Sequence, residues 1–261
     1  MRLRECVCTY AQRALNRGRR LLSRFCERRA PITHDSSLNS HSCQVLLLAC
    51  RARNRAIADA RRLEARGDHI IATDDAIPAI VLAAAATEAF INDMAETIGV
   101  CRQNASDWMG AALTPELRTC ADAIFDAEFE GDFDPQKYFL ASKALGQQFD
   151  RGREPFQFFA KLIALRNEVI HIKANRADGK HTGASVTMEL AQRELTVKFS
   201  VGQMSCFDQI QSPQVAAWAC KSAIDIVFAL LDKVPHSDFC VLDGTYKHFH
   251  AQQGLIATDW V

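Results

Sequence analysis

Three side chains capable of phosphate chemistry lie within six residues of one another, at Arg166, Asn167 and His171. An arginine guanidinium offers a planar fork of N–H donors that matches the nonbridging oxygens of a phosphate. An imidazole titrates near neutral pH and can transfer protons, and an asparagine amide can hold the imidazole or donate to the phosphate. RNA carries its own nucleophile, the 2′-hydroxyl. Such a set could therefore cleave RNA to a 2′,3′-cyclic phosphate without a metal, by transferring protons and stabilising the phosphorane charge.

The helix that carries these residues predicts that Arg166 faces the protein interior. Phe159, Ile163, Arg166 and Ile170 follow one another at spacings of four, three and four, which places them on one stripe of a helix. An unpaired guanidinium on a buried face costs several kcal/mol or more, so Arg166 needs a carboxylate or a solvated pocket. Glu88 is a carboxylate on the apolar stripe of another predicted helix. We expect Glu88 and Arg166 to meet.

Asn167 and His171 lie on a second stripe, after Ala160 and Ala164. In an ideal helix Arg166 is turned away from this stripe by about a third to a half of a circle. A site that uses all three residues therefore needs the helix to end near His171, or a second subunit to complete it. Each residue also has a structural interpretation: an ion pair for Arg166, a solvent-facing position for Asn167 and a helix C-cap for His171.

The segment 166–171, with the pattern R-N-x-x-x-H, resembles the R-x4-6-H active-site motif of HEPN-domain ribonucleases. The bare pattern is weak, because the segments 29–34 and 176–181 also fit it, in text typical of loops. The context of the segment 166–171 carries the resemblance. It ends an apolar helix, an Ala-rich helix containing 87–92 precedes it, and a helix beginning near 213 follows it.

The resemblance implies a mainly α fold, an HEPN-like up-and-down helical bundle over residues 43–235. It implies a metal-independent RNA endonuclease of the toxin–antitoxin or defence type, with RNA as substrate and no cofactor. It also implies a homodimer that joins two motifs, and a nucleotidyltransferase-type antitoxin as a further partner. The alternatives are a non-catalytic HEPN-like module that binds nucleotide, RNA or protein, and an unrelated bundle whose motif arose by chance.

The site residues follow from the resemblance together with the helical stripes. Arg166, His171 and Asn167 are the expected catalytic residues. Glu88 and Asn92, on the Ala-rich helix, are the expected supporting residues. No metal ligands are expected, because the ten Cys contain no CxxC pair and the only close His pair, at 248 and 250, lacks further ligands at a familiar spacing. The sequence also lacks P-loop, GxSxG and HExxH motifs.

Secondary structure is indicated by apolar periodicity and by capping residues. Proline directly after threonine, aspartate or serine is typical of a helix start, and glycine of a helix end. Helices are expected over residues 43–66, 74–98, 114–131, 134–149, 154–173 and 212–233. Between the last two, apolar and polar residues alternate at 186–190 and again at 195–201. Period two predicts an inserted β-hairpin near 185–201.

The two ends of the chain differ from this domain. Residues 1–42 contain nine Arg, no Lys and three acids, a net charge of +6 in a chain whose total is zero. This composition fits a disordered basic leader, with a transit peptide or an RNA-binding arm as alternatives. Residues 236–261 are expected to form an irregular tail. The most apolar run, 76–91, is short and interrupted by Pro78 and Glu88, so a cytoplasmic protein with no membrane span is expected.

Overall fold

The chain is mainly α-helical. The computed structural model describes residues 41–68, 70–103, 113–131, 134–170, 182–197, 205–235 and 250. Within these ranges it contains eight helices and no strand. Their bounds are α2 (His41–Ala65), α3 (Ala76–Gln103), α4 (Pro115–Glu130), α5 (Asp134–Ala144), α6 (Phe156–Ile170), α7 (Thr182–Gln192), α8 (Cys206–Gln209) and α9 (Pro213–Leu231).

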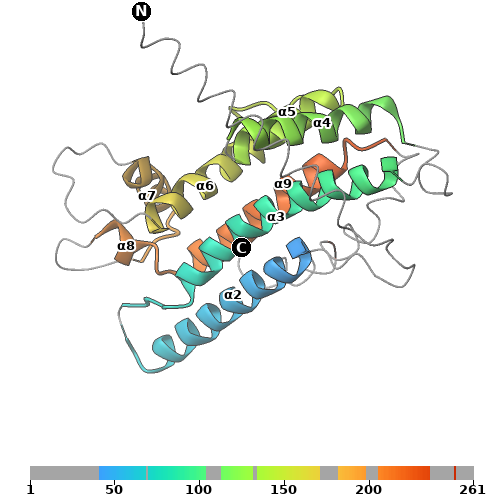
Figure 1. Cartoon of the computed structure of the whole chain (residues 1–261). Helices are drawn as coiled ribbons and strands as arrows, with labels where there is room; N and C mark the ends of the chain where they lie inside the picture. The colour runs from blue at the N-terminus through green and yellow to red at the C-terminus, as the bar shows by residue number, and fades with distance from the viewer. Residues whose placement is uncertain are drawn as a thin grey trace, which may run out of the picture. The chain divides into compact units, whose positions relative to one another are not determined.

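Helix α3 lies at the centre of the described helices and packs against α2, α4, α6 and α9 (Figure 1). Its Ala-rich segment 83–86 lets neighbouring helices approach closely, and Phe90, Ile91 and Met94 fill the core beyond it. Helices α4 and α5 lie side by side, as do α6 and α7 (Figure 1). This arrangement brings the middle of α3 next to the last turns of α6.

Predicted helix starts are confirmed where a local cap defines them. The Thr114 side chain accepts a hydrogen bond from the backbone N–H of Leu117 at 3.3 Å, and Ser212 accepts one from Val215 at 3.0 Å. A proline follows each cap at the first helical position. Gly131 ends α4 with φ of 79°, in the left-handed conformation that glycine adopts without strain.

Two predicted helix ends are wrong. Helix α3 continues through Gly99 to Gln103, because Ile98 and Cys101 are buried and Gly99 packs beneath the ring of Phe125. Helix α5 ends at Ala144 and not near residue 149, followed by Gly146 with φ of 78°. The end of α3 is therefore set by long-range packing, and the end of α5 is set by the turn at Gly146.

The first strand of the predicted β-hairpin is also wrong, because residues 182–192 form α7. Val186 and Leu190 are buried at a spacing of four, whereas Met188 between them is 65% exposed. Lys161 on α6 donates to Glu189 on α7 at 2.5 Å, which fixes the helix in place. In the second predicted strand, residues 195–197 are not in a strand, and residues 198–204 lie outside the described part of the chain.

Two of the described helices, α3 and α9, are long and apolar enough to cross a membrane by length and composition alone. Half of the apolar window of α3 and 67% of that of α9 are buried inside the structure. Core helices of soluble proteins pass the same test, so this observation carries little weight.

Tyr138 connects α5 to the core, and removing its hydroxyl tests the hydrogen bond in that connection. It is fully buried, its hydroxyl donates to the carbonyl of Thr87 at 2.9 Å, and its ring lies 4.6 Å from that of Phe159. We expect Tyr138→Phe to lower the free energy of unfolding by about 1 kcal/mol, because the buried hydrogen bond from its hydroxyl to the Thr87 carbonyl is lost. Urea denaturation measures this change. Equal midpoints for the variant and the wild type would contradict the expectation.

Candidate functional site

Arg166 lies near the end of α6, just before its last turn, and its side chain reaches α3. Its Nη2 donates to Glu88 Oε2 at 2.8 Å, so the contact expected from the two apolar stripes is confirmed. The Arg166 side chain is 20% exposed, and that of Glu88 is closer to half-exposed. Phe159 and Ile163 on the same stripe are buried, whereas Ile170 is exposed. The guanidinium therefore sits at the edge of the core, where solvent still reaches it.

Asp134 is a second carboxylate next to Arg166, and it was not among the predicted site residues. It opens α5, its side chain is 8% exposed, and its Oδ2 lies 3.8 Å from Arg166 Nη2. A usable signal was present: Asp134, Tyr138 and Ala141 form one buried stripe at spacings of four and three. A charged residue on such a stripe was the same feature that singled out Glu88.

Asn167 contacts Nη1, the second terminal nitrogen of the Arg166 guanidinium. Arg166 Nη1 donates to Asn167 Oδ1 at 3.1 Å, and Asn167 is exposed to solvent. The amide of Asn167 and the Nη1 edge of Arg166 thus share the solvent side of α6, despite their separate stripes. One nitrogen of the fork faces carboxylates and the other faces an exposed amide.

Two predicted site residues remain, Asn92 and His171. Asn92 is half-buried one turn after Glu88, and no hydrogen bond between described residues joins it to Arg166. His171 follows Ile170, the last residue of α6, and lies outside the described residues. Its proximity to Arg166 stays a prediction.

The pKa of the Asp134 carboxyl is raised from an ordinary value of 3.8 to about 6. Burial is the largest cause, and the charges of Glu88 and, to a smaller extent, Glu128 add to it. Lys137 and Arg166 act in the opposite direction without outweighing them. Lys137 is itself buried and pairs with Glu128. Three carboxylates thus face two cations, and protonation of Asp134 would balance the charges.

Tyr138 stays a neutral hydrogen-bond donor beside this cluster. Burial raises its pKa well above the ordinary value, and the nearby Asp134 adds to that effect. Among the described residues, no three His, Cys, Asp or Glu side chains form a group that could hold a metal ion. The cluster therefore offers a positioned guanidinium, an exposed amide and a carboxyl that titrates near neutral pH.

Comparisons of this chain with protein-family models, with curated proteins and with solved structures found no match.

Proposed function

We propose that this protein is a metal-independent RNA endonuclease of HEPN type, with the helices of residues 43–235 forming an HEPN-like up-and-down bundle. The observation that carries the proposal is the placement of Arg166. Its guanidinium is held at the edge of the core by Glu88, and its Nη1 edge lies beside the exposed Asn167. His171 follows five residues after Arg166, directly beyond the described end of α6.

In the proposed reaction, the 2′-hydroxyl of RNA attacks the adjacent phosphorus and the bond to the 5′-oxygen breaks. The imidazole of His171 accepts the proton of the 2′-hydroxyl, and a second imidazole, from the other copy of a homodimer, gives a proton to the departing 5′-oxygen. Arg166 stabilises the charge on the nonbridging oxygens, and Asn167 donates to the same phosphate. The products are a 2′,3′-cyclic phosphate and a 5′-hydroxyl.

Glu88 and Asp134 act as positioning residues for Arg166 in this mechanism. Both contact its Nη2, so Nη1 is the nitrogen that turns toward the solvent side. The Nη1 edge can then contact a phosphate while Nη2 keeps its carboxylate partners, of which Glu88 is partly exposed and Asp134 is buried.

The proposal is tested by RNA cleavage in the presence of EDTA. We expect the wild type to produce fragments ending in 2′,3′-cyclic phosphate, and the double variant Arg166→Ala/His171→Ala to produce none above background. Light scattering on the same preparations should report a homodimer. Equal cleavage by both proteins would remove the proposed site, and cleavage abolished by EDTA would remove the metal-independent mechanism.

The proposed biological setting is a cytoplasmic toxin or defence component, held in check by a nucleotidyltransferase-type antitoxin. Growth arrest on expression, relieved by His171→Ala, would support it.

A second candidate is a non-catalytic HEPN-like module that binds RNA, a nucleotide or a protein. The surplus of carboxylates around Arg166 favours it, because negative charge opposes a phosphate at that point, and a module that only binds does not need a phosphate there. Retention of RNA on the immobilised protein without cleavage would favour this module over the nuclease.

A further inference from the structure

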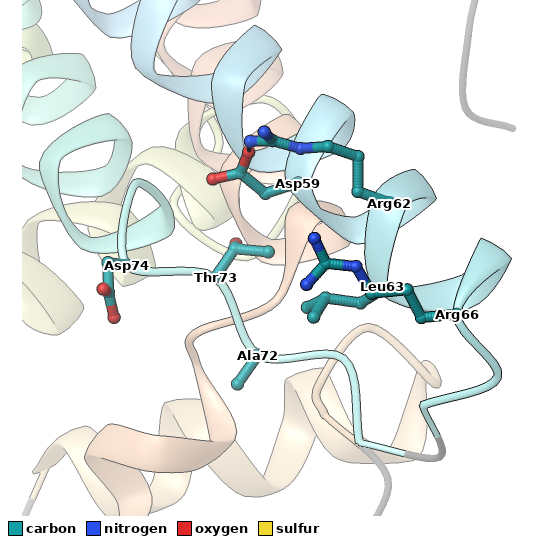
Figure 2. A pocket seen from close by; sticks show the side chains of 7 residues that line it. All are labelled: Asp59, Arg62, Leu63, Arg66, Ala72, Thr73 and Asp74. Atoms are coloured by element: carbon teal, nitrogen blue, oxygen red, sulfur yellow. Dashed lines mark hydrogen bonds and ion pairs between the residues drawn. The ribbon is translucent and has the colours of Figure 1, made fainter.

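A second polar feature lies at the start of α3, where the segment after α2 turns back. An open pocket of about 310 Å³ is lined by Asp59, Arg62, Leu63, Arg66, Ala72, Thr73 and Asp74 (Figure 2). The start of α3 at Ala76 and the position of Glu88 are separated by roughly 18 Å along the helix axis. The pocket is therefore separate from the Arg166 cluster.

The two arginines of this pocket differ in their partners. The Arg62 guanidinium pairs with Asp59, one turn earlier on α2. The Arg66 guanidinium reaches over Leu63 toward Thr73 (Figure 2), and no described residue accepts a hydrogen bond from it or pairs with it. Arg66 thus presents a free set of donors to the pocket.

Thr73 is the second residue of the pocket with an unused hydrogen-bonding group. It is 2% exposed, and among the described residues its hydroxyl has no hydrogen-bond partner. Its backbone is fully engaged, because its N–H donates to the carbonyl of Gln211 at 2.8 Å and its carbonyl accepts from Ala76 at 3.2 Å. A buried hydroxyl without a partner costs free energy, so its retention calls for a ligand or another explanation.

One ligand chemistry satisfies both groups. A phosphate oxygen can accept from the Arg66 guanidinium while another accepts from the Thr73 hydroxyl. The pocket is lined by two arginines and two aspartates. Arg62 is paired with Asp59, so Arg66 is the cation that can attract an anion.

The rest of the pocket fits the remainder of a nucleotide. Its volume is at the lower end of the range of small-molecule sites and larger than a phosphate ion needs. Leu63 and Ala72 give it an apolar wall, and the exposed carboxylate of Asp74 can accept hydrogen bonds from sugar hydroxyls. We propose that this pocket binds the phosphate group of a nucleotide through Arg66 and Thr73, whether or not the Arg166 site cleaves RNA.

Binding is measured by calorimetry and by thermal unfolding of the full chain. The probes are inorganic phosphate, uridine and adenosine 5′-monophosphates, and a short 2′-O-methyl RNA, which keeps the phosphates but lacks the nucleophile. We expect the nucleotide probes to raise the melting temperature, and Arg66→Ala to weaken their binding by about tenfold. Arg51→Ala is the matched control, since it removes an exposed arginine of α2, the helix that precedes Arg66, outside the pocket.

Thr73→Val separates a binding role from a structural one. It removes the unpaired hydroxyl at nearly constant volume, so the free protein should melt a few degrees higher while binding of the nucleotide probes weakens. A preference for the monophosphates would identify a free nucleotide as the source of the phosphate, and a preference for the 2′-O-methyl RNA would identify an RNA backbone. No binding by any probe, equal losses in Arg66→Ala and Arg51→Ala, or undiminished binding by Thr73→Val would overturn the proposal.

Discussion

Arg166→Lys is expected to lower the rate of RNA cleavage by about 100-fold while leaving the melting temperature nearly unchanged. Lysine keeps the positive charge next to Glu88 and Asp134, so the ion pair that connects α6 to α3 survives. It lacks the planar fork, and an ammonium cannot donate at once toward these carboxylates and toward a phosphate beside Asn167. The variant therefore separates the structural role of the charge from its role in binding phosphate.

The matched control is Arg193→Lys. Arg193 is also partly exposed, pairs with Glu189 at 3.1 Å and lies over the ring of Phe158, away from the proposed site. The same chemical change there should leave the cleavage rate at the wild-type value. Cleavage rates and melting curves of the two variants, measured side by side, distinguish a phosphate-binding role of Arg166 from a purely structural one. An Arg166→Lys protein as active as the wild type would reduce Arg166 to a structural ion pair.

Helix positions could be predicted from the sequence wherever the signal was local. Thr114 and Ser212 cap their helices with their own side chains, and the proline after each is compatible only with the first turn. Gly99 was an equally clear local signal for a helix end, but α3 continues through it to Gln103. The burial of the residues around it and its contact with Phe125 on α4 stabilise the helix through that position. Such contacts are absent from any local window of sequence.

The predicted hairpin failed for a related reason. Three apolar residues at 186, 188 and 190 fit a strand by their alternation, but the first and last of them also fit one face of a helix. Only the location of the buried surface distinguishes the two cases. Contact with α6, through Lys161 and Glu189, places residues 186 and 190 inside and leaves Met188 in solvent.

The pairing of Arg166 with Glu88 was predictable because each is a lone charge on an apolar helical face. Asp134 was not predicted as a partner of Arg166, because an aspartate before a proline is already explained as a helix start. The pocket at Arg66 and Thr73 combines the end of one helix with the segment before the next, and its defining property is the lack of partners. That property exists only in three dimensions.

Asp134→Asn is expected to stabilise the protein at neutral pH by at most about 3 kcal/mol, the free energy that corresponds to moving a carboxyl pKa from 3.8 to about 6. Because the pKa of Asp134 is raised in the folded state, that state holds a proton that the unfolded chain has already released in this window. The free energy of unfolding of the wild type should therefore fall as pH rises from about 4 to about 6, and stay lower above it. The asparagine is neutral throughout and keeps an acceptor near Arg166, so this component of the pH dependence should vanish in the variant.

Urea denaturation at a series of pH values between about 4 and 7 measures the difference between the two proteins, which should be smallest at the acidic end. Asp122→Asn on α4 is the control, because it removes an exposed aspartate that is also paired with an arginine, Arg102. It should leave the fall in stability between these pH values in place. A constant difference between wild type and Asp134→Asn across the series would mean that Asp134 does not hold its proton in the folded protein. The carboxyl would then be a permanent anion beside Glu88, and the charge around Arg166 would oppose a phosphate at every pH.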